Sequence, residues 1–382
     1  MNKYNTKMKK IAILTFPLGK SGCVATSNLV DILCSISNDI HLVTGNAGYD
    51  FFKGDTRIHV YEIRHESGSY LISRVFFYFL TQLKMIFKLL KTLKNVDIWI
   101  FFIGGNLLVL PMSVLKFLRK KVIMIYAGSS YISFASTGSN LSILINIIEN
   151  VNSYLSDYII LYSPSLIKEW CFLKYRNKIH IASRHFLNLK EFKIKKKFEN
   201  RSNSIGYVGR LSEEKGLLNF AKAIKEISKE NYNLNYFIGG DGELRNQIEK
   251  YFEKERVFNV KIIGWISHEQ LPDFLNDLKL IVLPSYTEGL PNIILEAMAC
   301  GTPVLANSVG SIPDIIKDGE TGFIMEDNSP KCIAKNIQRV LSYPNLDQII
   351  KNARALILRE FTYEAAVDRY RKIFYDLLES SK

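Results

Sequence analysis

The stretch LPSYTEGLPNIILEAMACG, residues 283–301, decides the fold of this chain. An apolar run ends at Leu283, as a buried strand does, and a polar loop follows it. Pro291 suits the first turn of a helix, and Gly301 suits the position just after its last turn. The Ile, Leu and Met side chains between them supply a buried face. The stretch therefore predicts a strand, a loop and a helix, the unit from which parallel sheets are built.

Two glutamates give this stretch a chemical interpretation. Glu288 precedes the predicted helix, and Glu296 lies about one turn inside it. Continuous helix would separate them by about 12 Å. Because carboxylates accept hydrogen bonds from hydroxyl groups, the pair is able to hold a sugar at one end and a ribose at the other, with the free amides of the first turn favouring a diphosphate between them. Helix starts favour acidic residues in any case, which accounts for Glu288 but not for Glu296 on an apolar segment.

Short β-branched and aromatic runs alternate with helical patterns along the whole chain, which indicates parallel sheets. In the first half, the predicted strands are residues 10–16, 40–43, 58–63, 98–103, 121–126 and 158–162. In the second half, they are residues 204–208, 234–238, 260–263, 280–283, 303–307 and 322–325. The polar, Lys-rich residues 190–203 are the predicted linker. We therefore expect an α/β chain of two Rossmann-like, doubly wound domains, residues 1–195 and 200–361.

The positive charge of the chain is confined to its first half. The 382 residues carry a formal net charge of +13. Residues 1–200 contain 27 Lys and Arg against 12 Asp and Glu, and the remainder contains 23 against 25. A nucleic-acid binder with uniform basic charge is not expected to show this division, whereas a domain that touches anionic lipid or an anionic acceptor is. An ordinary solvated surface is the alternative.

The cysteines and the N-terminus indicate a cytoplasmic protein. The five cysteines are scattered and form no C-x-x-C pair, so we interpret them as reduced core residues. The apolar run at residues 11–16 is short and stops at Pro17, so it predicts a first strand and not a signal peptide.

Residues 67–96 contain no acidic residue and have a helical pattern. Arg74, Lys84, Lys88 and Lys91 fall within one sector of about 100°. Apolar side chains occupy the other side: Phe76, Phe79, Leu83, Ile86, Phe87 and Leu90. Such a basic amphipathic helix can lie peripherally on an anionic membrane surface, here the inner face of the cell membrane. The alternative is a helix packed on its own sheet with solvated lysines.

Residues 98–118 contain a single charge, Lys116, and are long enough to span a bilayer. Gly104, Gly105 and Pro111 interrupt this run at points that fit a strand, a turn and a new helix. The prediction is therefore a strand and a helix of a soluble domain, not a transmembrane segment.

Common phosphate motifs are missing from the first half. Gly19-Lys20-Ser21 looks like the end of a P-loop, but Leu14 stands where the first glycine is needed. No G-x-G-x-x-G follows this strand, which disfavours enzymes that use NAD. Gly19 still lies in a loop whose backbone is able to approach a ligand, although an ordinary turn explains it equally well.

The second half has better candidates for a diphosphate site. Gly209 and Arg210 leave a predicted strand, and Lys215 follows at the start of a helix. Arg forks onto phosphate oxygens, Lys acts as a point charge and helix amides add their dipole. A solvated turn is the alternative. Tight turns after the next two strands contribute further candidates: Gly240, Asp241 and Gly242, which bring backbone close to a ligand, and Gly264 and Trp265, which could flank a base.

Together these motifs resemble glycosyltransferase family 4. The resemblance is carried by Glu288 and Glu296 within P-S-x-x-E-G-x-P-x-x-x-x-E-A-M-A-C-G, by G-R-L-x-x-E-K-G at residues 209–216 and by G-D-G at residues 240–242. It implies the GT-B architecture, two Rossmann-like domains that face a central cleft. The first domain would bind the acceptor and the second the nucleotide-sugar donor. A last helix, residues 362–382, would cross back onto the first domain.

The resemblance also implies roles for the site residues. Arg210 and Lys215 would grip the diphosphate as catalytic cations, Glu288 would bind sugar hydroxyls beside the reacting carbon, and Glu296 would bind the ribose. Backbone amides would contact sugar and phosphate at Gly289, Leu290, Pro291 and Asn292. Members of the family retain anomeric configuration and need neither a metal nor a cofactor. The donor phosphate deprotonates the acceptor hydroxyl in a front-face displacement.

The implied function is transfer of a hexosyl group from a UDP- or GDP-sugar to a hydroxyl of a saccharide or lipid-linked acceptor, in cell-surface polysaccharide or glycolipid biosynthesis. Nucleic acid is not expected as a partner. One feature departs from the family: its members carry a His after the strand matched by residues 121–126, where this sequence reads YAGSS. Two alternatives stay open, a sugar-nucleotide 2-epimerase of the same architecture and a catalytically impaired donor-binding partner in a glycan assembly complex.

Overall fold

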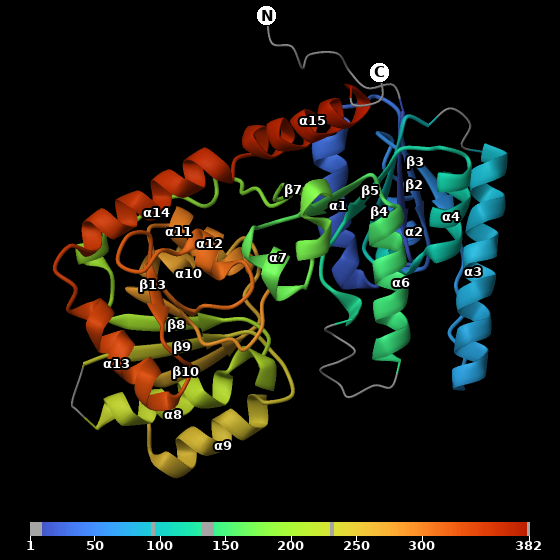
Figure 1. Ribbon diagram of the computed structural model, residues 1–382. Coiled ribbons are helices and arrows are strands. Elements are labelled where there is room, and N and C mark those ends of the chain that lie inside the picture. The colour runs from blue at the N-terminus through green and yellow to red at the C-terminus, as the bar shows by residue number, and fades with distance from the viewer. Residues whose placement is uncertain (1–9, 93–95, 132–140, 230–232, 380–382) are drawn as a thin grey trace, which may run out of the picture. The chain divides into compact units, whose positions relative to one another are not determined.

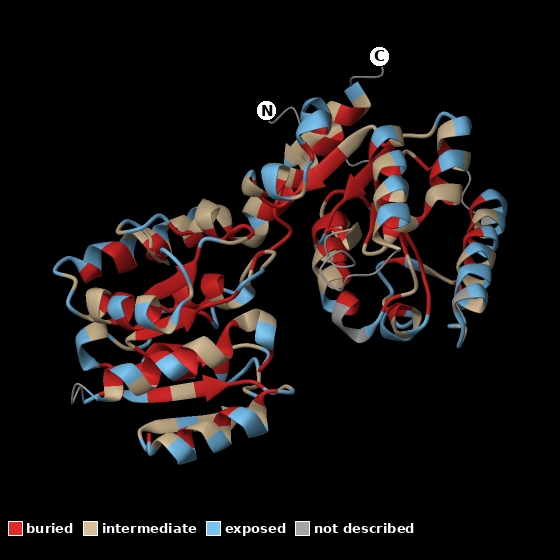
Figure 2. Ribbon diagram, turned by 60° about the horizontal axis from the view of Figure 1, so that its bottom comes forward, coloured by how far each residue is buried: buried red, intermediate tan, exposed pale blue. Residues whose placement is uncertain are grey.

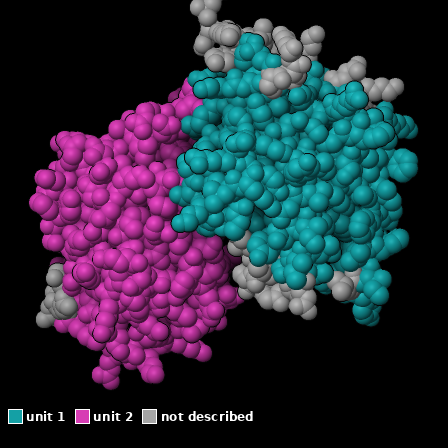
Figure 3. Space-filling view, viewed as in Figure 1, with its two compact units in different colours: residues 1–184, 366–382 teal, residues 185–365 magenta. Residues whose placement is uncertain are grey.

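The computed structural model describes residues 10–92, 96–131, 141–229 and 233–379 (Figure 1). The chain divides into two compact units (Figure 3). Unit 1 comprises residues 1–184 and 366–382, and unit 2 comprises residues 185–365. Each unit is built on one parallel sheet with helices on both faces.

Unit 1 contains a seven-stranded sheet of order β3-β2-β1-β4-β5-β6-β7. Its strands are β1 Ile11–Thr15, β2 Ile40–Thr44, β3 His59–Glu62, β4 Ile98–Phe102, β5 Val122–Ile125, β6 Tyr158–Leu161 and β7 Ile179–Ile181. Its helices are α1 Lys20–Cys34, α2 Ala47–Phe52, α3 Leu71–Thr92, α4 Val109–Phe117, α6 Ser142–Leu155, α7 Ser165–Glu169 and α15 Tyr363–Glu379, with short 3-10 turns η1 Gly105–Leu107 and η2 Leu173–Lys178.

Unit 2 contains a six-stranded sheet of order β10-β9-β8-β11-β12-β13. Its strands are β8 Ser204–Val208, β9 Asn235–Gly239, β10 Val260–Gly264, β11 Leu280–Leu283, β12 Val304–Asn307 and β13 Phe323–Met325. Its helices are α8 Leu217–Ser228, α9 Arg245–Glu255, α10 Leu271–Asp277, α11 Asn292–Ala299, α12 Ile312–Ile315, α13 Pro330–Leu341 and α14 Leu346–Glu360, with 3-10 turns η3 Phe198–Asn200 and η4 Glu213–Lys215.

Both sheets are doubly wound, and their strand order places the ligand edge. The chain reverses direction across the sheet between β1 and β4 in unit 1 and between β8 and β11 in unit 2. Central strands are buried on both faces, which is why their sequences are continuously apolar (Figure 2). Ligands of such sheets bind outside the carboxyl ends of the strands at the point of reversal. In unit 2, that point lies beside residues 209–216 and 284–291.

The two predicted doubly wound domains are confirmed. All twelve predicted strands are present, and none of their ends is shifted by more than one residue. Strand β7 was not predicted, because three residues, half-exposed at a sheet edge, give no clear pattern. Residues 98–118 form β4, η1 and α4, as expected from the interrupting glycines. Within the described ranges, no helix is both long and apolar enough to cross a membrane.

The predicted linker, residues 190–203, is packed on unit 2. Asn276 accepts hydrogen bonds through Oδ1 from the amides of Lys195 and Lys196, at 2.7 and 3.3 Å. The guanidinium of Arg201 is buried and donates to Cys300 O at 2.7 Å and to Thr302 Oγ1 at 2.8 Å. The polar side chains of residues 190–203 therefore bind specific partners distant in sequence and do not mark a linker. The division between the units falls earlier, at residue 184.

The last helix, α15, packs on unit 1 from residue 366 onward. Arg369 donates to the carbonyl of Ser183 at 3.2 Å, and Arg371 donates to the carbonyl of Ser35 at 3.4 Å. Tyr370 is fully buried in the same contact. Unit 1 is therefore completed by a segment far from the rest of it in sequence.

The cysteines are all free thiols, but they are not all in the core. Cys23 and Cys300 are buried, whereas Cys171 is exposed, so its assignment to the core was wrong. Cys171 has a φ of 59° directly after α7, where the chain turns at the surface.

Candidate functional site

A pocket of about 290 Å³ lies at the carboxyl edge of the unit 2 sheet. Its size is at the lower end of small-molecule sites, which run from about 300 to 1,000 Å³. The residues that matter chemically come from the loop after β8 and from the stretch between β11 and the middle of α11. They are Gly209, Lys215, Ser285, Glu288, Asn292 and Glu296.

Lys215 is brought to the pocket by a left-handed glycine. Gly216 has a φ of +69°, and a Cβ atom there would lie 2.0 Å from the carbonyl oxygen of Pro284. Only glycine lets η4 and the start of α8 approach the loop after β11 this closely. Lys215 therefore stands directly before the N-terminus of α8, as its position in the sequence predicts.

Glu288 and Lys215 form the polar centre of the pocket. The Lys215 ammonium donates to Glu288 Oε1 at 2.9 Å, and the Ser285 hydroxyl donates to the same oxygen at 2.7 Å. The Glu288 side chain is 10% exposed and that of Lys215 is 24% exposed. A half-buried cation held by a carboxylate at a helix N-terminus is placed to receive an anion.

Helix α11 begins one residue later than predicted. Pro291 has a ψ of 120° and caps the helix from outside, so its placement in the first turn was wrong. Pro291 lies outside the helix because its backbone is extended, and this extended residue leads the loop into the pocket. The first-turn amides of Asn292 and Ile293 donate to no acceptor among the described residues. These two N–H groups are therefore available to a ligand.

Glu296 is a buried carboxyl group in the wall of this pocket. It is 7% exposed, and burial raises its pKa to about 7. Within the described part of the chain, its carboxyl group has neither a hydrogen bond nor an ion pair. Burying such a group without a partner destabilises a fold, so a bound ligand is the natural source of its missing hydrogen bonds.

Arg210 does not join Lys215 in the pocket wall. Its side chain is 72% exposed and lies 3.6 Å from the carboxylate of Glu214. Glu214 is itself held by the hydroxyl of Ser212 at 2.7 Å. The structure therefore brings together Lys215, Glu288 and Glu296, while Arg210 stands apart on the same loop.

The predicted glycine turns are explained by backbone packing. A Cβ atom on Gly240 would lie 1.9 Å from the carbonyl oxygen of Gly209, and one on Gly242 would lie 2.5 Å from that of Leu211. Gly264 has a φ of +72°, and its carbonyl accepts from the Gly240 amide at 2.6 Å. These turns hold the loop after β8 in place. Their contact with a ligand stays a prediction, as does that of the neighbouring Trp265, Asp241, Gly289 and Leu290.

Unit 1 contains a second pocket, of about 230 Å³, that the sequence did not predict. It is lined by Asn106 and by residues 126–130, the segment that lacks the family's His. Glu149 on α6 is buried beneath it and accepts from the Ser130 amide at 2.7 Å and from the Ser129 hydroxyl at 3.2 Å. Burial raises the pKa of Glu149. The sequence signal that could have indicated this pocket is a single Glu within the apolar residues 142–155.

Gly19, a predicted ligand-binding residue, lies at the start of α1. It has open space where a side chain would be.

Comparison with known proteins bears on unit 2 most directly. Residues 189–356 match the family described as glycosyl transferases group 1. This chain carries a group 1 glycosyl transferase domain. The domain holds the whole unit 2 pocket, including Lys215, Glu288 and Glu296.

Two relatives and one solved structure show the extent of the similarity. The chain is 29% identical over half its length to the capsular polysaccharide biosynthesis glycosyltransferase CapM of Staphylococcus aureus, covering 51% of it. It is 30% identical over 45% of its length to UDP-Gal:alpha-D-GlcNAc-diphosphoundecaprenol alpha-1,3-galactosyltransferase of Escherichia coli, covering 45% of it. The chain thus spans about half the length of these curated relatives.

Similarity to a solved structure extends over nearly all of the chain. The crystal structure of HepE from Anabaena in complex with UDP covers 96% of this chain and is itself covered fully, with a TM-score of 0.75 and 16% identity. At that identity, the likeness shows the fold alone, which is GT-B. Group 1 assignment and GT-B fold therefore agree with the two doubly wound units described above.

Proposed function

We propose that this chain transfers a sugar from a nucleoside-diphosphate sugar to a hydroxyl group of a saccharide or lipid-linked acceptor, with retention of configuration, in cell-surface polysaccharide or glycolipid biosynthesis. The observation that carries the proposal is the convergence of Lys215, Glu288 and the unpartnered Glu296 in one pocket. A sugar nucleotide supplies a partner for each: phosphate for the lysine and hydroxyl groups for the two carboxyl groups.

The charge of the leaving diphosphate is assigned to Lys215 and the free amides of α11. Charge grows on the diphosphate as the glycosidic bond breaks, so cations and amides aimed at it lower the barrier more than they stabilise the bound donor. Arg210 would become a second cation by exchanging Glu214 for a phosphate oxygen. In this proposal, the protein groups balance the charge and no cofactor takes part.

Glu288 is assigned to the sugar and Glu296 to the ribose. Glu288 already orients Lys215, so it couples sugar binding to the position of the cation. The acceptor hydroxyl would attack from the face on which the diphosphate leaves, giving its proton to a donor phosphate oxygen. A hexosyl donor on UDP is supported by the UDP in the HepE complex and by the UDP-Gal in the name of the Escherichia coli relative, and a GDP-sugar is the second candidate donor.

The test is turnover of a panel of UDP-, GDP- and ADP-sugars by the purified chain, with and without saccharide and polyprenyl diphosphate acceptors. We expect nucleoside diphosphate release from one donor, increased by an acceptor, and a product with the donor's anomeric configuration by NMR. Conversion of the donor into its 2-epimer without acceptor would support the epimerase alternative. Donor binding without any turnover would support a catalytically impaired partner.

We also propose that unit 1 docks on an anionic membrane through the layer of α3, α4 and α6. Helix α3 packs inward through Thr81, Gln82, Met85 and Leu89. The predicted apolar side of α3 points outward and not toward the sheet. The alternative of a helix that packs its apolar side on the sheet and exposes only lysines therefore does not fit. Its exposed side chains are Ile72, Phe76, Phe79, Leu83, Phe87 and Leu90. Arg74, Lys84 and Lys91 flank them and are exposed.

Helix α6 buries polar side chains and exposes apolar ones, the reverse of an ordinary surface helix. It buries Glu149, Asn152 and Ser153, because they bond to the pocket loops of unit 1. Its exposed side is apolar: Ile143, Leu144, Ile147, Val151 and Tyr154. Helix α4 contacts both α3 and α6 and exposes Phe117. An apolar surface of this extent next to lysines matches the interface of an anionic bilayer.

Changing Lys84, Lys88 and Lys91 together to glutamate should weaken binding to phosphatidylglycerol vesicles roughly 100-fold, since each basic residue near the surface contributes about 1 kcal/mol. The measurement is co-sedimentation with vesicles at fixed ionic strength. The matched control carries the same change at Lys222, Lys250 and Lys254, which are exposed on unit 2. Equal binding by both variants would reject the membrane surface.

A further inference from the structure

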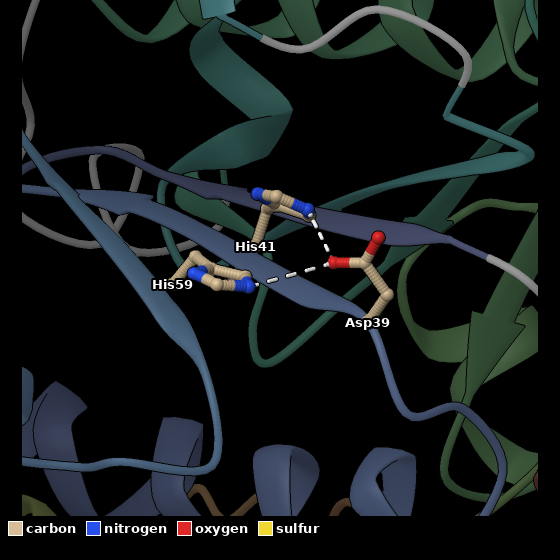
Figure 4. Close-up of side chains that lie close together, drawn as sticks. All are labelled: Asp39, His41 and His59. Carbon is tan, nitrogen blue, oxygen red and sulfur yellow. Dashed lines mark ion pairs between the residues drawn. The ribbon is translucent and has the colours of Figure 1, made fainter.

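Three potential ligand side chains converge at the amino ends of β2 and β3 in unit 1 (Figure 4). His41 and His59 are direct neighbours in the register of these two parallel strands. Asp39 precedes His41 by two residues, so all three side chains lie on one face of the sheet. One ligand atom from each lies within 4.8 Å of the others. This edge is opposite to the strand ends that carry the ligand loops.

The His41 ring is held by a neighbour on its far side. Its Nδ1 lies 3.0 Å from the hydroxyl of Tyr61, which fixes the ring orientation. Its Nε2 lies 2.6 Å from Asp39 Oδ1, but among the described residues neither atom has a hydrogen-bond partner in suitable geometry. His41 is 4% exposed.

We propose that Asp39, His41 and His59 bind one divalent transition-metal ion, with Zn²⁺ as the best match. Two imidazoles and one carboxylate suit Zn²⁺, whereas Mg²⁺ and Ca²⁺ prefer oxygen ligands alone. Bonds of about 2.0–2.1 Å in tetrahedral geometry place ligand atoms about 3.3 Å apart. The Asp39–His41 distance of 2.6 Å would widen and the Asp39–His59 distance of 3.8 Å would shorten to reach it.

The surroundings of the three ligands fit this arrangement. Tyr61 supplies the outer hydrogen bond that ligating histidines usually have. Lys10 approaches the other carboxylate oxygen of Asp39, at 3.8 Å, and leaves Oδ1 for the metal. The rings of His41 and His59 are stacked with centroids 4.8 Å apart, so the two imidazoles already lie side by side. A metal here joins the edge strand β3 to β2 and takes no part in sugar transfer.

The experiment uses the full chain without a histidine tag, freed of metal by a chelator. Zn²⁺ is titrated by calorimetry, and Co²⁺ is added to a second sample to read its visible absorption. We expect one ion per chain, cobalt bands typical of tetrahedral coordination and a higher thermal midpoint with Zn²⁺. His59→Ala should weaken binding at least 100-fold and abolish the thermal shift. Its side chain is 66% exposed, so the variant should fold.

The matched control is His268→Ala, which removes an exposed histidine from unit 2 and should bind as the wild type does. Equal affinity of the wild type and His59→Ala would overturn the site, and so would the lack of a bound ion in the wild type. Both readouts are independent of sugar transfer.

Discussion

Replacing Glu288 by glutamine is expected to slow sugar transfer by at least about 100-fold while leaving the fold intact, the scale of one interaction made mainly in the transition state. Glutamine keeps the volume of the side chain and can still accept from the Ser285 hydroxyl through its amide oxygen. It loses the charge that holds the Lys215 ammonium at 2.9 Å. The cation is then less well placed against the leaving diphosphate.

The measurement is the initial rate of transfer with the donor identified by the panel, together with the thermal midpoint. Glu213→Gln is the matched control. Glu213 is exposed on η4, and its substitution removes the same charge at a position two residues from Lys215. A Glu288→Gln rate within twofold of the wild type would show that this residue has been given the wrong role.

Glu296→Gln is expected to stabilise the protein at pH 8 and to weaken donor binding. The pKa of Glu296 in the fold is about 7 and its usual value is 4.5. The unfolded chain therefore loses this proton first as the pH rises. Below about pH 4.5 the carboxyl group is protonated in both states and its ionisation costs nothing; between about pH 4.5 and 7 it increasingly opposes folding. The cost above pH 7 is on the order of 3 kcal/mol.

Calorimetric unfolding at pH 5 and pH 8 checks this prediction. The variant should unfold several degrees above the wild type at pH 8 and close to it at pH 5. Glu269→Gln, at an exposed position of unit 2, controls for loss of charge. If wild type and Glu296→Gln showed the same dependence on pH, Glu296 would not be a buried, unpartnered acid. A residue that is kept for ligand binding at the cost of fold stability is expected to behave in this way.

The strands and their order were predictable because both sheets are parallel and buried. Continuous apolar runs such as residues 98–102 need no distant information, and glycines and prolines mark their ends. Helix α6 was not predictable in the same way. Its periodicity is visible, but which side faces inward depends on Glu149, whose partners Asn106 and Ser130 lie far away in the sequence. Ordinary reasoning would bury the apolar side.

The site was predictable to the extent that its residues share short segments. Lys215, Glu288 and Glu296 were all candidates from spacing, and they line one pocket because β8 and β11 are neighbours in the sheet. Arg210 was expected to pair with Lys215, but its position after β8 points it toward solvent and Glu214. The unit 1 pocket was missed, since its polar groups come from three separate segments.

We propose that a sugar nucleotide binds in the unit 2 pocket with its diphosphate on Lys215. The most direct test is nucleoside diphosphate release from the donor panel by the wild type, Lys215→Ala and the exposed control Lys222→Ala. We predict release from one donor at equal rates in the wild type and Lys222→Ala, and at least about 100-fold slower release in Lys215→Ala. Release by Lys215→Ala at the wild-type rate, or no release from any donor by the wild type, would contradict this mode of donor binding.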